Sequence, residues 1–326
     1  RPIQHAADTT ISCIQACVQL HPRQRAQLPT QRHAGSFACS IGTGFQFVMN
    51  QLFASLHTER LSLPAGEVWA GSVMGRQKAS IEGGKVSIRH ELITMGDAGE
   101  AGQCQVGILT LDRPRRAHAY NREHLEGIRS AFRSLTRDVS IVVICSTGDR
   151  AFCGGADLGE MEQAAPLDAL DLLSQRVFTE IARSAAVSIC AVQGPAVAGG
   201  CELALACDLR VVGPGALFRL PETSLGIIPS AGGCTRLTRL VGASVSKQVI
   251  LAGMSIDARR AVEIGLAMGV EEDAYAGALA LAQKVGARDS VANRYAKQVI
   301  DRGEDEGSLE AERAYEALLY ARKAGQ

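Results

Sequence analysis

Two spacings of hydrophobic residues alternate along the chain from about residue 100 onward. Four short segments are almost continuously apolar, which predicts strands buried on both faces: residues 106–112, 139–145, 187–192 and 209–212. Longer segments between them repeat hydrophobic residues every three or four positions, which predicts helices at 121–135, at 167–186 and around 204–207. Strands that alternate with helices favour parallel pairing through crossover connections, so the chain is predicted to be an α/β protein.

The pattern differs at the two ends of the chain. Helical spacing dominates after residue 235 and predicts helices at 236–241, 245–251, 258–264, 274–285, 291–301 and 309–324. Residues 1–86 show neither spacing and carry eight Lys and Arg against four Asp and Glu, so we expect this segment to be poorly ordered. An organelle-targeting region and an upstream gene-model extension are both open interpretations. The predicted organisation is therefore an N-terminal segment 1–86, a core 87–250 and a helical region 251–326.

Composition narrows the class of protein. Hydrophobic residues make up 46% and charged residues 21%, and the net charge is zero, so nothing in the total favours nucleic acid or an acidic membrane surface. We find no charge-free apolar run of about 18 residues and predict no transmembrane helix. None of the ten cysteines are spaced C-x-x-C, which favours reduced, buried thiols over a metal site or a disulfide framework.

Histidine limits the possible chemistry. All seven histidines lie at or before His124, so residues 125–326 cannot by themselves build a Ser-His-Asp or Cys-His mechanism or a histidine metal site. The turn from Gly194 to Gly200 has the spacing of a phosphate loop, but Cys201 stands where the loop needs lysine. Acid–base work in this part of the chain must use carboxylates, Lys, Tyr or Cys.

Two acidic residues lie beside glycine-rich turns. Glu202 falls in the first turn of the helix after Ala198, among apolar neighbours that would raise the pKa of its carboxyl. Glu222 lies in a loop flanked by hydrophobic residues and a second glycine turn. Two such acids suit a general acid and base. Each also has a simpler interpretation, Glu202 as a partner of the helix dipole and Glu222 as a surface acid.

A third glycine turn, residues 151–161, again follows a predicted strand and leads into a helix. Backbone amides exposed at two such turns can converge on one oxygen, which is what an oxyanion hole requires. The alternative is an ordinary strand-to-helix loop with Asp157 as a cap.

Taken together, these segments resemble the signature of the crotonase (enoyl-CoA hydratase/isomerase) superfamily over about residues 100–320. The matching pieces follow the family's order, at residues 111–114, 152–158, 191–208 and 221–240, and the twenty-residue step from Glu202 to Glu222 is that of its hydratases. The resemblance implies a crotonase (ClpP-like) spiral of ββα units with a helical C-terminal region used in trimer formation.

Roles for individual residues also follow from the resemblance. The amides of Ala156 and Gly199 would hold the thioester oxygen, Glu202 would activate water for attack at C3, and Glu222 would deliver the proton at C2. Other contacts to the substrate and its CoA would come from Cys153, Gly155, Asp157, Leu158, Gly200, Pro229 and Gly232. The implied reaction is hydration of a 2-enoyl-CoA thioester in fatty-acid or branched-chain amino-acid catabolism, with coenzyme A as part of the substrate, no separate cofactor and no metal.

The amino-acid sequences of residues 202–211 and 300–303 resemble those of the family's mitochondrial branch. This branch includes methylglutaconyl-CoA hydratase and the enoyl-CoA hydratase domain-containing proteins. We therefore expect a mitochondrial matrix protein, with the cytoplasm as the alternative, that forms a homotrimer or a dimer of trimers. Four positions depart from the family: His118 replaces the asparagine of Asn-Ala-Leu, Ala198 replaces one glycine, Ser230 replaces another, and Tyr120 replaces the leucine of Asn-Ala-Leu. The last two leave the length of the acyl chain open.

Two other functions fit the same resemblance. One is isomerisation of the double bond, which some members carry out with one acid. The other is an RNA-binding or inactive crotonase-fold protein, in which a Lys-rich helix contacts RNA. The matching segment here, residues 121–135, has three arginines and no lysine, and it also carries Glu123 and Glu126, which favours a solvated amphipathic face.

Overall fold

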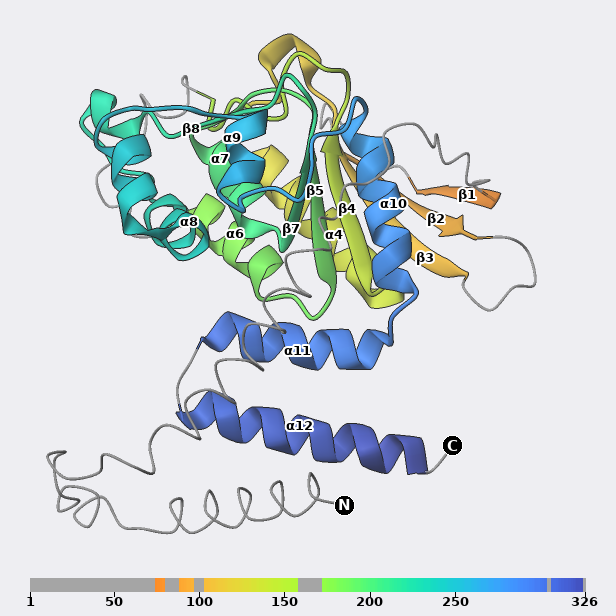
Figure 1. Ribbon diagram of the computed structural model, residues 1–326. Helices are drawn as coiled ribbons and strands as arrows, with labels where there is room; N and C mark the ends of the chain where they lie inside the picture. Colours follow the sequence, from red (N-terminus) through yellow and green to blue (C-terminus); the bar gives the residue numbers. More distant parts are fainter. Residues whose placement is uncertain (1–73, 80–87, 97–102, 158–171, 304–305, 325–326) are drawn as a thin grey trace, which may run out of the picture. The chain divides into compact units, whose positions relative to one another are not determined.

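A six-stranded sheet forms the centre of the molecule. The computed structural model describes residues 74–79, 88–96, 103–157, 172–303 and 306–324, all within one compact unit of the chain. The strand order is β1-β2-β3-β4-β5-β7 (Figure 1). The strands are β1 Met74–Ala79, β2 Ile88–Met95, β3 Cys104–Leu111, β4 Ile141–Ser146, β5 Val187–Val192 and β7 Leu209–Val212. The pairs β1–β2 and β2–β3 are antiparallel, and the pairs from β3 to β7 are parallel.

A second, three-stranded sheet holds short segments next to the glycine turns. Its order is β6-β8-β9, with β6 at Ala196–Val197, β8 at Leu217–Arg219 and β9 at Ile256–Asp257. Because β6 leads directly into α7 (Gly199–Ala206), this small sheet fixes where that helix begins. Two 3-10 turns, η1 (Pro114–Arg116) and η3 (Glu222–Leu225), complete the loops around it.

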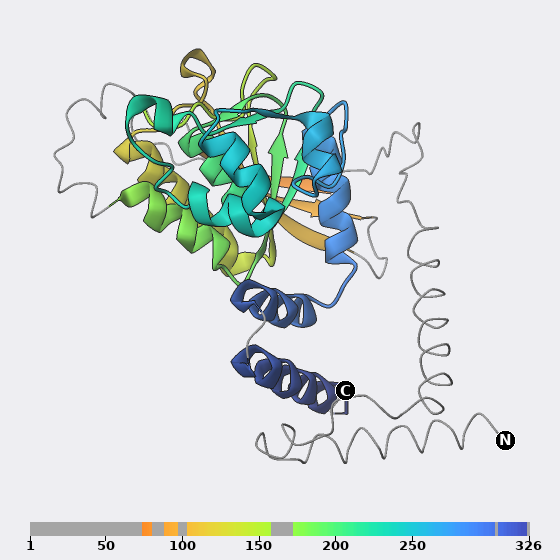
Figure 2. The same cartoon turned by 60° about the vertical axis from the view of Figure 1, so that its left-hand side comes forward.

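Helices cover both faces of the main sheet (Figures 1 and 2). One face packs against α10 (Ala274–Gly286), which presents Ala274, Ala278 and Ala282, spaced four residues apart on one side of the helix. The opposite face packs against α4 (Arg122–Asp138) and α6 (Leu173–Ala182), with α7 beside α6. Alternate side chains of β4 and β5 enter the two layers, so these strands are buried on both sides.

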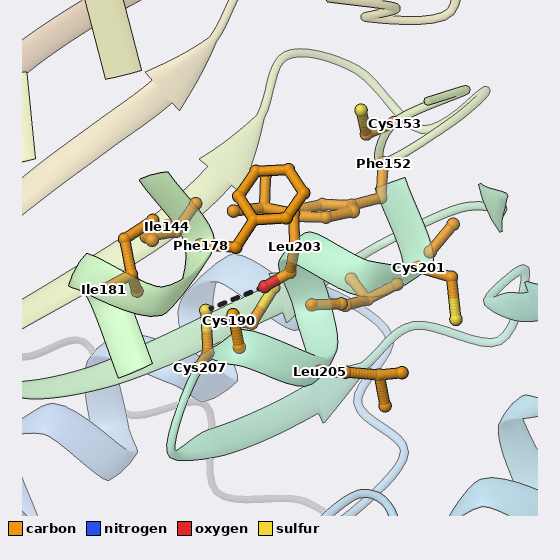
Figure 3. Packing of buried hydrophobic residues seen from close by; sticks show 14 of the residues in the cluster. Ile144, Phe152, Cys153, Phe178, Ile181, Cys190, Cys201, Leu203, Leu205 and Cys207 are labelled. Atoms are coloured by element: carbon orange, nitrogen blue, oxygen red, sulfur yellow. Dashed lines mark hydrogen bonds between the residues drawn. The ribbon is translucent and has the colours of Figure 1, made fainter. Parts of the chain in front are cut away.

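Large side chains fill the layer that carries α7. Figure 3 shows Phe178 of α6 packed beside Leu203 of α7, and Ile181 of α6 next to Ile144 of β4. The Cys207 thiol donates to the Leu203 carbonyl at 3.5 Å and closes the end of α7. Every residue of α7 is buried, so the whole helix, including its acidic residue, is held inside the protein.

The remaining helices follow the small sheet and the end of the chain. They are α8 Gly233–Ile250, α9 Ala258–Glu263, α11 Ser290–Arg302 and α12 Glu306–Ala324. Lys297 joins α11 to the main sheet, because its ammonium donates to the Ala186 carbonyl at 2.9 Å and to the Asp208 carboxylate at 2.7 Å. The same carboxylate accepts from the N–H and hydroxyl of Ser188.

Substitution of Lys297 by methionine tests this connection. We expect the free energy of unfolding to fall by about 3 kcal/mol, because the variant leaves a largely buried carboxylate without its cation. Denaturant unfolding of the purified protein measures the change. Lys284→Met, on the exposed side of α10, is the matched control. Equal loss in both variants would contradict the role of the ion pair.

Most of the expected elements are present, with several corrections. Residues 187–192 and 209–212 are the strands β5 and β7, and Asn121 caps α4 by accepting from the His124 N–H at 2.9 Å. The helix expected at 167–186 ends at Ala182, and residues 158–171 lie outside the described part of the chain. The two helices expected at 236–241 and 245–251 are one element, α8, broken at Gly242, whose φ of 80° and ψ of 162° are not helical.

The pattern did not predict the antiparallel edge of the sheet. Strand β1 falls within the range 1–86 that we expected to be poorly ordered, and it pairs with β2. Residues 1–73 and 80–86 of that range lie outside the described part of the chain. The helix α10, from the range 251–326, packs on the main sheet rather than in a separate layer of helices. The division of the chain into three regions otherwise stays a prediction.

Candidate active site

Two turns lie side by side where the main sheet meets the small sheet. The turn after β4 pairs with β6: Cys153 bridges Ala196, and the N–H of Val197 donates to the Cys153 carbonyl at 2.9 Å. A Cβ added to Gly200 would fall 2.0 Å from that carbonyl oxygen. The first turn of α7 is therefore pressed against the turn after β4, and only glycine fits at the contact.

The two backbone amides expected to form an oxyanion hole belong to these turns. Gly155 has a φ of 91°, and a Cβ added to it would fall 3.0 Å from the nitrogen of Gly199. Tyr120 hydrogen bonds on either side of Ala156, to the Gly155 carbonyl and the Asp157 N–H. No backbone hydrogen bond found in the described residues uses the N–H of Ala156 or of Gly199. Gly199 begins α7, where N–H groups lack intrahelical acceptors and attract negative charge.

Glu202 lies in the first turn of α7 and is only 4% exposed. Its Oε1 accepts a hydrogen bond from the N–H of Gly233 at 2.8 Å, which ties α7 to the start of α8. Burial raises the pKa of this carboxyl to about 7; the Gly233 N–H opposes the rise, and the negative charge of Glu222 adds to it. A carboxyl with a pKa near neutrality can both take and give a proton.

Glu222 begins the 3-10 turn η3 and is 6% exposed. Burial raises the pKa of its carboxyl above the ordinary value. Its Oε2 is buried and meets no hydrogen-bond partner among the described residues. Since buried polar atoms in proteins are nearly always hydrogen-bonded, this oxygen is suited to contact a molecule that enters the site.

Three residues near Glu202 were not expected from the sequence. Gly233 is the hydrogen-bond donor described above, whereas the sequence had pointed to its neighbour Gly232, the N-terminal cap of α8. Arg236, one turn along α8, donates to the Ala231 carbonyl at 2.7 Å, and its charge lowers the pKa of Glu202. The third is Tyr120, whose hydroxyl reaches the start of α7. A glycine run before a helix was a signal for Gly233. The sequence marked Tyr120 only as a departure from the family that leaves the acyl chain length open, and nothing in the spacing marked Arg236.

The other residues expected to contact the substrate and its CoA differ in their surroundings. The Cys153 thiol is fully buried and donates to the His118 carbonyl at 3.2 Å, so its main chain, and not its sulfur, faces the neighbouring turn. Asp157 pairs with Arg113 at 3.1 Å. Pro229 is buried beside Gly233. Leu158 lies outside the described residues. The substrate contacts assigned to these residues stay predictions.

The burial of Glu202 has a consequence for stability. Its carboxyl has a pKa of about 7 in the folded protein against an ordinary value of 4.5, so the folded state binds this proton more tightly. The free energy of unfolding therefore falls as pH rises from about 4.5 to 7. We expect Glu202→Gln, which cannot ionise, to be about 1–3 kcal/mol more stable than the wild type at pH 8 and nearly equal to it at pH 4.5.

Denaturant unfolding at the two pH values measures this difference. Glu263→Gln, at an exposed position on α9, is the control and should follow the wild type at both. A Glu202→Gln curve that runs parallel to the wild-type curve across this pH range would contradict the raised pKa.

Comparison with known proteins agrees with this geometry. The sequence profile of the family described as enoyl-CoA hydratase/isomerase matches residues 101–324. A relative from Arabidopsis thaliana, named probable enoyl-CoA hydratase 2, mitochondrial, is 41% identical over 201 residues, which cover 60% of this chain and 67% of the relative. The 2,3-dehydroadipyl-CoA hydratase of Escherichia coli (strain K12) is 38% identical over 221 residues, covering 67% of this chain and 86% of the relative.

Solved structures show the same likeness. A crystal structure of an enoyl-CoA hydratase subunit from Geobacillus kaustophilus HTA426 superposes with a TM-score of 0.65 at 30% identity. The superposition covers 72% of this chain and 90% of that one. The expected crotonase architecture is therefore confirmed.

Proposed function

Because the chain belongs to the enoyl-CoA hydratase/isomerase family, we propose that Glu202 and Glu222 hydrate a 2-enoyl-CoA thioester bound to the amides of Ala156 and Gly199. The protein is an enoyl-CoA hydratase, a hydro-lyase that adds water across the 2,3 double bond. Coenzyme A enters and leaves as part of the substrate. The observation that carries the assignment of roles is the pair of buried carboxyls, each with a raised pKa, of which Glu202 shares the first turn of α7 with Gly199. The N–H groups of Gly199 and Ala156 make no backbone hydrogen bond within the described residues.

The reaction begins at the thioester oxygen. The N–H groups of Ala156 and Gly199 donate to this oxygen and stabilise the negative charge that moves onto it when C3 is attacked. The free N–H at the start of α7 suits this role, because the positive end of the helix dipole lies there.

The two acids then complete the addition. Glu202, as the carboxylate, takes a proton from water while the water oxygen forms a bond to C3. The C2–C3 double bond becomes an enolate that the two amides hold. Glu222, as the neutral acid, gives its proton to C2, and the enolate returns to the thioester. One of the two carboxyls is neutral and the other ionised before and after the addition, so the pair gains and loses no proton over the reaction.

Possession of two acids favours hydration over isomerisation, because moving a double bond needs a proton to be taken and returned but no activated water. The test is turnover of a 2-enoyl and of a 3-enoyl thioester of CoA, followed by identification of the products. We expect the 2-enoyl substrate to give the 3-hydroxyacyl product at a far higher rate than the 3-enoyl substrate gives the 2-enoyl product. Faster conversion of the 3-enoyl thioester would make isomerisation the main reaction.

The structure gives no support to the RNA-binding alternative. Arg129 and Arg133 of α4 both form ion pairs with Glu180 of α6, and Arg129 also pairs with Glu126, so the two cations face two carboxylates within the protein. A groove that follows a nucleic-acid backbone needs cations free to replace its counterions.

We also propose a mitochondrial location and a homotrimeric assembly. The location is supported by the Arabidopsis thaliana relative, whose name describes it as mitochondrial. The assembly is supported by exposed hydrophobic side chains at the end of α8 and just beyond it, among them Leu251 at 70% and Met254 at 53% exposure. Light scattering of the purified protein measures the assembly directly. Within the described residues, no helix is both long and apolar enough to cross a bilayer.

A further inference from the structure

Tyr120 stands where the family tends to have leucine, and its side chain is buried at 6% exposure. The ring meets Phe178 of α6 edge to face, with the ring centres 5.8 Å apart and the planes at 86°. Burial raises the pKa of this hydroxyl well above its ordinary value, and the side chain of Ser174, also on α6, opposes the rise. A leucine could fill the space beside Phe178, but it carries no hydroxyl.

The hydroxyl of Tyr120 also touches the start of α7. A Cβ added to Gly199 would fall 1.8 Å from the tyrosine oxygen, so this oxygen occupies the space of the side chain that residue 199 lacks. The other end of the same residue grips the neighbouring turn: its N–H donates to the Gly155 carbonyl at 2.9 Å, and its carbonyl accepts from the Asp157 N–H at 2.8 Å. One residue therefore contacts the main chain on both sides of Ala156 and, through its hydroxyl, Gly199.

We propose that Tyr120 is a positioning residue that sets the distance between the amides of Ala156 and Gly199. The proposal rests on the proposed function of those amides. The backbone of Tyr120 fixes the Ala156 side of the oxyanion hole, and its hydroxyl fixes the Gly199 side. The negative charge on the carbonyl oxygen grows during the reaction. A small error in the distance between the amides therefore weakens their hydrogen bonds to the transition state more than those to the bound substrate.

Tyr120→Phe tests the role of the hydroxyl, because it keeps the ring packing and the backbone bonds. We expect kcat to fall about tenfold and KM to stay within about twofold of the wild type, because loss of the hydroxyl would displace the Gly199 amide by well under ~1 Å. Ser174→Ala should also lower kcat. The double variant should have a kcat no lower than that of Tyr120→Phe alone, because both substitutions act through the same hydroxyl. Tyr295→Phe, in the ring stack with Tyr315 far along the chain, is the matched control.

A second measurement separates this proposal from the function itself. Infrared difference spectra of bound butyryl-CoA labelled with ¹³C at its carbonyl report how strongly the two amides polarise that group without any turnover. We expect the shift of the stretching frequency to be smaller in Tyr120→Phe than in the wild type, and unchanged in Glu202→Gln and in Tyr295→Phe.

The outcomes are distinct. A wild-type protein that shifts the carbonyl band but hydrates no enoyl thioester would overturn the proposed function and leave the positioning role supported if Tyr120→Phe loses the shift. A Tyr120→Phe protein with the wild-type band shift and kcat, or one that changes KM alone, would overturn the positioning role. Absence of any band shift in the wild type would overturn both.

Discussion

Glu202→Gln is expected to lower kcat for hydration by about 10²–10⁴-fold while the protein stays folded. Glutamine has the shape of glutamate, and its carbonyl oxygen can still accept the hydrogen bond from the Gly233 N–H. What the variant loses is the ability to take a proton from water as C3 is attacked. Because the change acts on the chemical step, KM should move far less than kcat.

Steady-state hydration of a 2-enoyl thioester measures this loss, with circular dichroism as the check on folding. Glu263→Gln serves again as the matched control and should keep full activity. A folded Glu202→Gln protein with wild-type turnover would remove Glu202 from the mechanism and leave its buried carboxyl without an assigned role.

Gly200→Ala is expected to give the second large effect. Its new Cβ would lie 2.0 Å from the carbonyl oxygen and 2.6 Å from the carbonyl carbon of Cys153. These are backbone atoms, so the turn after β4 and the start of α7 must separate. Since the two amides of the oxyanion hole belong to these elements, we expect kcat to fall about 100-fold and the free energy of unfolding by about 1–3 kcal/mol.

Kinetics and denaturant unfolding of the same preparation test both parts of this expectation. Gly215→Ala is the control, because its Cβ would have only the Gln193 carbonyl oxygen, at 3.4 Å, as a near neighbour. If Gly200→Ala keeps wild-type kcat, the two turns do not depend on this contact, and the account of the oxyanion hole fails.

The parts of the fold that follow a hydrophobic period could be predicted from the sequence. The parallel strands β3, β4, β5 and β7 are continuous apolar runs, and the helices after them keep the spacing of three and four residues. The antiparallel strand β2 was not predicted, because its burial is irregular and its residues include Arg89, His90 and Glu91. Strands of two or three residues, such as β6 and β9, are too short to show any period.

The candidate site divides in the same way. Glu202 and Glu222 could be proposed because carboxyls beside glycine turns stand out among apolar neighbours, and the structure places both in buried positions whose pKa is raised. The contacts of Tyr120 with the start of α7 and of Arg236 with Thr179 of α6 could not be proposed, because they arise only when elements distant in sequence pack together. Sequence spacing identifies groups that can react, whereas tertiary packing decides which groups hold them in place.

The central claim is that two buried carboxyls add one water to one thioester. It is tested most directly by turnover of crotonyl-CoA in ²H₂¹⁸O, with the product analysed by mass spectrometry. The account predicts a 3-hydroxyacyl thioester that carries ¹⁸O on C3 and deuterium on C2, formed by the wild type and nearly absent with Glu202→Gln. Unchanged crotonyl-CoA, or a product without ¹⁸O at C3, would contradict it.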